Sequence, residues 1–119
     1  MSVAVARLKR RADFLRVAST RRRYAAPGVV LQAMKRDGDE TGLRVGFTAT
    51  RKLGGAVQRN RAKRRLRAAA HAVLPVAGAH GYDYVLIARA GTLTRPWPLL
   101  LEDLNKALLA VNPRQTGPG

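Results

Sequence analysis

The segment between Glu40 and Asp83 contains no acidic residue. Inside it, residues 59–67 read RNRAKRRLR. At 100° per residue, a helix through this run separates a narrow apolar stripe from a cationic side. The stripe consists of Ala62, Leu66, Ala69, Ala70 and Val73, and the far side carries Asn60, Arg61, Arg64, Arg67 and His71. Any fold of this chain must therefore bury one edge of this helix and leave the other strongly positive.

Charged runs are usually the solvated faces of helices, but two features argue against that interpretation here. Solvated faces normally mix charge signs at i and i+4, whereas Arg61 precedes Arg65 and no acid is near. Cations in a first helical turn also oppose the helix dipole, at roughly 0.3–1 kcal/mol each. The free N–H groups of a helix N-terminus nevertheless attract phosphate. The run therefore indicates a polyanionic partner.

The composition narrows the choice of partner. The formal net charge is +16 and the pI about 11.8, which favours nucleic acid or an anionic membrane. No apolar run approaches the ~20 residues that span a bilayer, so nucleic acid is the stronger prediction. The absence of cysteine excludes disulfides and thiolate metal sites and is consistent with a reducing cytosol. The Arg-rich residues 1–24 resemble a transit peptide, but Phe14 and Leu15 favour a native helix.

Hydrophobic periodicity predicts one domain with the order α-β-β-α-β-α and a core spanning residues 7–111. We expect helices at 7–19, 58–74 and 97–111, the second ended by Pro75, and strands at 29–34, 43–50 and 82–88. We expect a linker at 20–28, a turn at 37–42, a glycine loop at 51–57 and a mobile tail at 112–119. The expected core contacts of the outer helices are Leu8, Phe14, Leu15, Ala18, Trp97, Leu100, Leu101, Leu104, Leu108 and Val111.

Two of the expected strands define the sheet. Residues 43–50 alternate apolar and polar, whereas residues 84–88 are continuously apolar, as in a strand covered on both faces. Gly54 and Gly55 supply backbone freedom where the first of these strands gives way to a helix. The pattern predicts an α+β sandwich in which a small sheet is covered by helices.

No catalytic constellation is visible in the chain. His71 and His80 have no acidic neighbour, and Glu102 and Asp103 point about 100° apart on a helix. The acids at 37–40 are explained by turn formation, and no metal-ligand spacing is present. The sequence therefore predicts a protein that binds and positions a partner, without catalytic or metal-binding side chains of its own.

Several ordered motifs together resemble the bacterial ribonuclease P protein component. An arginine-asparagine-arginine helix that follows a glycine loop is the signature of that family. The matching segments are Asp13-Phe14, residues 44–47 (RVGF), 51–54 (RKLG), 56–67 (AVQRNRAKRRLR) and 83–89 (DYVLIAR). The resemblance spans roughly residues 7–111.

The resemblance implies a fold and a function. The fold would be an α+β two-layer sandwich with a small mixed sheet, three helices and a left-handed βαβ crossover, shared with one class of ribosomal protein domain. The protein would be the small subunit of a cytoplasmic endoribonuclease that removes 5′ leaders from precursor tRNA. The catalyst would be a large RNA, which would bind most of the Mg²⁺. No membrane and no obligate protein partner are implied.

The resemblance also assigns residues by position. The surface facing the catalytic RNA would be Arg59, Asn60, Arg61, Lys63, Arg64, Arg65 and Arg67. The cleft for the single-stranded leader would be Phe14, Gln32, Thr48, Thr50, Arg51 and Lys52. The family commonly has further aromatics where this chain has Ala18 and Gln32 or Ala33, so leader contacts here would depend more on charge. Phe14 is either a stacking platform or an ordinary core residue.

Two other functions fit the same charge. One is a ribosomal or ribosome-assembly protein that binds structured RNA without turnover. The other is a nucleoid-type protein that prefers duplex DNA and has a steeper salt dependence than a single-strand binder.

Overall fold

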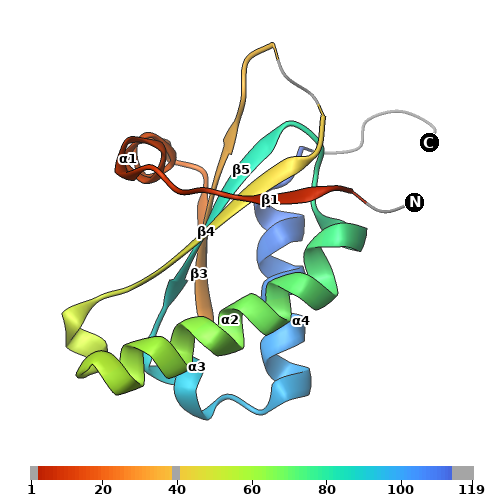
Figure 1. The fold of residues 1–119 in the computed structure, drawn as a ribbon. Helices are drawn as coiled ribbons and strands as arrows, with labels where there is room; N and C mark the ends of the chain where they lie inside the picture. The colour runs from red at the N-terminus through yellow and green to blue at the C-terminus, as the bar shows by residue number, and fades with distance from the viewer. Residues whose placement is uncertain (1–2, 39–40, 114–119) are drawn as a thin grey trace.

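A computed structural model describes residues 3–38 and 41–113 of the chain (Figure 1). The strands are β1 Val5–Arg7, β2 Arg23–Ala26, β3 Val29–Lys35, β4 Leu43–Ala49 and β5 Tyr82–Ala88. The helices are α1 Arg11–Ser19, α2 Ala56–Ala77, α3 Ala90–Thr94 and α4 Trp97–Val111, with a 3-10 turn, η1, at Arg51–Leu53.

The strands form a mixed sheet in the order β1-β4-β5-β3-β2. The central strand β5 pairs in parallel with β4 and antiparallel with β3. The chain passes from β4 to β5 through α2, and in Figure 1, where β4 lies in front of β5, this crossover is left-handed. The predicted α+β class with a mixed sheet and helical cover is confirmed.

The two faces of the sheet are covered unequally. The main core lies between one face and the helices α2 and α4, and it includes Leu31, Tyr84 and Leu86. On the opposite face, Val17 of α1 and Leu8, from the segment between β1 and α1, pack against Val85. Figure 1 shows α1 and the α2–α4 pair on opposite sides of the strands. Strand β5 is thus covered on both faces, as its continuous apolar run predicts.

The N-terminal third of the chain differs from the prediction. Helix α1 begins at Arg11 instead of residue 7, because residues 5–7 pair with β4 as a parallel strand. Val17 is the α1 residue in the core, whereas Leu15 and Ala18 are exposed. The predicted linker contains β2, which pairs with β3 across the turn at Pro27 and Gly28. Strands of three or four residues are too short to show a period, so periodicity missed them.

Pro75 does not end α2, which continues to Ala77. Proline removes one backbone donor, and near the end of a helix this costs a single hydrogen bond. The N–H of Val3 donates to the Pro75 carbonyl at 2.8 Å, and the Gly78 N–H donates to Leu74 O at 2.9 Å. The last turn of α2 is therefore stabilised by the N-terminal segment.

Helix α4 has the predicted bounds, and Leu100, Leu104, Leu108 and Val111 are buried as expected. Leu101 is only half-buried, and the Trp97 side chain is 39% exposed instead of forming core. The short helix α3, which the sequence did not indicate, directly precedes α4. Trp97 thus lies at the corner where the α3–α4 connection meets α2, since Trp97 lines a cavity with Arg61 and Arg64.

The acids of the predicted turn at Asp39 and Glu40, and residues 114–119 of the predicted tail, lie outside the described residues. Within the described part of the chain, no helix has the length and apolarity needed to cross a bilayer.

Candidate nucleic-acid interface

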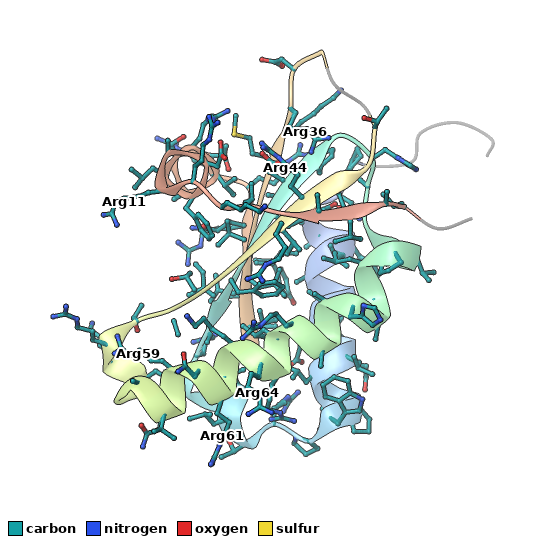
Figure 2. The ribbon with its side chains drawn as sticks, in the orientation of Figure 1. Arg11, Arg36, Arg44, Arg59, Arg61 and Arg64 are labelled. Carbon is teal, nitrogen blue, oxygen red and sulfur yellow. The ribbon has the colours of Figure 1, made fainter. Side chains whose placement is uncertain are left out.

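Arg61 and Arg64, on the cationic side of α2, point away from the sheet, whereas Arg67 and His71 border a space shared with β1 and β4. Figure 2 shows Arg61 and Arg64 projecting from the outer side of the helix. Asn60, Arg61, Arg64 and Arg67 are exposed, and Arg59 and Lys63 are half-buried. The predicted stripe of Ala62, Leu66, Ala69, Ala70 and Val73 is buried, joined by Leu74. The sequence therefore predicted which side of this helix faces the core.

The start of α2 lacks the usual compensation for its dipole. Its N-cap is Gly55, no side chain caps it, and its first turn has no acid. Gly54 has φ +139°, which only glycine adopts readily, so the loop's predicted backbone freedom is used there. The first-turn N–H groups and the nearby arginines are together suited to an anion. In residues 3–38 and 41–113, no carboxylate lies within ion-pairing distance of Arg59, Arg61, Arg64 or Arg67.

Arg65 differs from its neighbours on α2. Its guanidinium donates to the Thr92 carbonyl and to the Arg95 carbonyl, each at 2.6 Å. These bonds tie the α3–α4 segment to α2. The assignment of Arg65 to an RNA-facing surface stays a prediction, but its guanidinium already has two partners within the fold.

On the opposite face of the sheet, α1 borders a groove of about 340 Å³ lined by Lys9, Arg11, Phe14, Phe47 and Thr48. The Phe14 ring lies directly over Gly46, where a Cβ would come within 2.4 Å of the ring. Glycine is required here because any side chain would displace the aromatic ring. Phe14 is half-buried and packs beside the small cluster of Leu8, Val17 and Val85. It therefore both contacts core residues and lines the groove.

The other predicted cleft residues are distributed around this groove. Gln32 is in register with Val85, which is in register with Gly46, so Gln32 lies on the same face. Its side chain is buried, and it does not line the groove. Thr50 and the η1 residues Arg51 and Lys52 are exposed just beyond the end of β4. Lys9 and Arg11 were missed, although the run Lys9-Arg10-Arg11 shortly before Phe14 was a usable signal.

A cluster of ion pairs lies at the other end of the same face. The buried carboxylate of Asp83 accepts two bonds from Arg44, at 2.8 and 2.6 Å, and one from Arg36 at 3.0 Å. Asp13 pairs with Arg16 at 2.5 Å and lies 3.8 Å from Arg44. Figure 2 shows Arg36 and Arg44 converging there. Here the arginines are neutralised inside the fold.

A second, strongly basic cavity joins this cluster to the groove. It has a volume of about 500 Å³ and is lined by Arg7, Lys9, Arg10, Asp13, Arg16 and Arg44. Lys9 lines both spaces. The face carrying α1 therefore presents a continuous cationic path beside one half-exposed aromatic ring.

Two further buried polar groups, Asp103 and Tyr84, are hydrogen-bonded inside the fold. Buried Asp103 accepts from the Gly28 N–H at 2.9 Å and pairs with Arg95. Burial raises the pKa of Tyr84 to about 12, and its hydroxyl donates to Asn112 and accepts from the Ala79 N–H. Within the described ranges, no group of three His, Cys, Asp or Glu side chains could hold a metal ion.

Fold and surface together define a class: a small, strongly cationic α+β protein with a basic helix on one side of its sheet and a basic groove on the other. Comparison with known proteins makes the class specific. Residues 4–112 match the family model described as Ribonuclease P.

Relatives and solved structures agree with this match. The chain is 52% identical over 118 residues to the ribonuclease P protein component of Paramagnetospirillum magneticum, covering 97% of this chain and 89% of that one. It is 50% identical over 105 residues to that of Caulobacter vibrioides, covering 88% and 70%. The Thermotoga maritima RNase P protein superposes with a TM-score of 0.71 at 26% identity, covering 92% and 98%. A Staphylococcus aureus RNase P protein gives 0.69 at 25%, covering 89% and 97%. The chain belongs to the ribonuclease P protein component family.

Proposed function

We propose that this chain is the protein subunit of a ribonuclease P ribonucleoprotein, which removes the 5′ leader from precursor tRNA in the cytoplasm. Family membership supports this assignment, and the single structural observation that carries it is the exposed face of α2, where Arg61, Arg64 and Arg67 have no acidic partner among the described residues. Such a face is electrostatically unfavourable for the free protein and favourable against a phosphate backbone.

The α2 face is the proposed docking surface for the catalytic RNA. Its residues are Arg59, Asn60, Arg61, Lys63, Arg64, Arg65 and Arg67. Arg65 contributes indirectly, since its bonds to Thr92 and Arg95 hold the α3–α4 segment beside the exposed arginines. Arginine suits this role because its planar fork binds phosphate through two parallel bonds.

The groove beside α1 is the proposed path of the leader. Phe14 and Thr48 line it, and Gln32, Thr50, Arg51 and Lys52 lie on the same face or just beyond its end. A half-exposed ring beside cations suits a sequence-tolerant single-strand binder, because every base can stack and every nucleotide carries a phosphate. Lys9 and Arg11 extend the charge that the leader would meet.

The chemistry is assigned to the RNA partner. Mg²⁺ held mainly by that RNA would activate the attacking water, and the protein would bind, orient and neutralise phosphate repulsion. No membrane or obligate protein partner is required by this scheme.

A magnesium titration tests the proposal. The purified chain alone should not cut precursor tRNA at any Mg²⁺ concentration. Adding it to the ribonuclease P RNA of the same organism should restore cleavage at Mg²⁺ concentrations where that RNA alone is slow, because the protein's cations replace part of the ionic screening. Cleavage by the protein alone, or an unchanged rate at low Mg²⁺, would contradict the proposal.

The leader path has its own test. Arg51→Ala should weaken binding of precursor tRNA more than binding of mature tRNA, because the two ligands differ by the leader. Lys106→Ala, an exposed lysine on α4, provides the matched loss of one charge. Equal losses for the two tRNAs would show that the leader does not pass Arg51.

A further inference from the structure

A cavity at the junction of α2 and α4 lies next to the arginines proposed to face the RNA. Its volume is about 420 Å³, and it is lined by Arg61, Arg64, Arg65, Ala68 and Trp97. We call this set the Trp97 site. The site is a shallow, open depression, so it suits a group that lies flat against the surface. The chain's single tryptophan, which periodicity placed in the core, is thus a partly exposed wall of a cationic hollow.

The backbone around Trp97 is held in place before any partner arrives. Arg65 donates to the carbonyls of Thr92 and Arg95, so the segment leading into α4 is attached to α2. Pro96 is the N-cap of α4 and Pro98 occupies its first turn, which restricts φ on both sides of the tryptophan. A ring presented by a fixed backbone loses less conformational entropy when it binds.

The walls of the Trp97 site combine two chemistries. The indole offers an apolar aromatic surface, and the exposed Arg61 and Arg64 offer guanidiniums. The cation–π pair found among the described residues is Arg22 with Tyr82, so no guanidinium there covers the Trp97 ring. Ala68 is small and exposed, which leaves the space between the ring and the arginines open. An aromatic surface flanked by cations matches a nucleotide, which has a flat base and an anionic phosphate.

We propose that the Trp97 site takes one unpaired nucleotide of the catalytic RNA, with its base stacked on the indole and its phosphate held by Arg61 and Arg64. The inference rests on the proposed function, since the occupant belongs to the RNA docked on α2. The nucleotide is unpaired because a base within a helix has both faces covered by its neighbours. The cationic face of α2 attracts any RNA backbone. The Trp97 site would add a preference for an RNA that has an unpaired nucleotide at this position.

Trp97 itself reports on the test, because it is the only source of indole fluorescence in the chain. Titrating the full chain with the ribonuclease P RNA of the same organism should quench this fluorescence, with saturation at one RNA per protein. Trp97→Leu should weaken RNA binding about tenfold, within the range measured for stacked bases. Trp97→Phe should recover most of that loss, because it restores an aromatic face.

Further measurements separate stacking from a structural role and from charge. Trp97→Leu should leave the salt dependence of binding unchanged, because stacking releases no counterions. Its urea midpoint should match that of Leu99→Ala, a control at a similarly exposed apolar residue two positions along α4. Leu99→Ala should bind RNA as tightly as the unmodified chain does.

Unchanged fluorescence on saturation with RNA, or equal affinity for Trp97→Leu and the unmodified chain, would overturn the Trp97 site and leave the proposed function standing. Trp97→Phe binding as weakly as Trp97→Leu would also overturn it. Failure of the unmodified chain to bind the RNA at modest ionic strength would overturn both proposals together.

Discussion

The arginines on the two sides of the sheet have opposite environments. On the face of α1, Arg44 and Arg36 converge on the carboxylate of Asp83, whose side chain is 4% exposed. On α2, Arg61, Arg64 and Arg67 are exposed, with no acidic partner in the parts of the chain that the structure describes. The same residue type thus forms ion pairs inside the fold in one region and stays exposed to solvent in the other. Net charge alone cannot distinguish the two; the position of the carboxylates does.

The greatest loss of stability is expected when the buried ion pairs of Asp83 with Arg36 and Arg44 are disrupted. Asp83→Asn leaves Arg36 and Arg44 beside a neutral amide, and removing one partner of a buried ion pair costs about 3 kcal/mol. Urea unfolding should show this loss. Glu102→Gln, an exposed acid on α4, is the matched control and should change stability by less than about 0.5 kcal/mol. Equal midpoints for the two variants would show that the cluster contributes nothing to folding.

Two adjacent residues of α2 give the next largest contrast. Arg65→Ala removes two charge-assisted bonds to backbone carbonyls and should lower the free energy of unfolding by about 2 kcal/mol. Arg64→Ala removes an exposed guanidinium and should leave that free energy within about 0.5 kcal/mol. Thermal or urea unfolding of both variants measures the difference. If both lost the same stability, the division between inward and outward arginines on α2 would be wrong.

The exposed arginines of α2 are tested by the salt dependence of RNA binding. Arg64→Ala combined with Arg67→Ala should leave the fold intact and weaken binding to the catalytic RNA. The log–log salt slope should fall by roughly 1.4 to 1.8, because two phosphate contacts are lost. Lys35→Ala combined with Lys106→Ala removes the same charge from exposed positions off α2 and should change the slope less. An unchanged slope for the α2 pair would exclude these arginines from the interface.

The last prediction concerns Tyr84, a neutral side chain whose hydroxyl is hydrogen-bonded inside the fold. Burial raises the pKa of Tyr84 to about 12 from an ordinary value of 10.0, so the folded protein keeps this proton where the unfolded chain loses it. Stability from this group is therefore complete below pH 10 and is lost as the pH rises toward 12. Tyr84→Phe should cost about 1 kcal/mol at neutral pH and flatten this decline. Chemical unfolding at several pH values checks both, and an identical decline in the variant would assign it to other groups.

Local pattern predicted much of the fold. Periodicity within single elements correctly predicted four features. They are the buried stripe of α2, the alternation in β4, the apolar run of β5 and the bounds of α4. The 3-residue β1 and the 4-residue β2 could not be predicted from periodicity, because they are defined by their pairing with β4 and β3. The left-handed crossover runs against the usual handedness of such units, so the resemblance supplied it and periodicity could not.

Some features of the candidate site were predictable from the sequence, and others were not. The spacing of residues along α2 was enough to predict one apolar and one cationic face, because residues three or four apart lie on the same side of a helix. Three other features became visible only in the folded chain. Arg65 bonds to the carbonyls of Thr92 and Arg95, and Arg44 and Arg36 converge on Asp83. Trp97 is exposed beside Arg61 and Arg64. These contacts join residues far apart in the chain. Each contact depends on where distant segments meet in the fold. Residue spacing and charge within one segment cannot predict such a meeting.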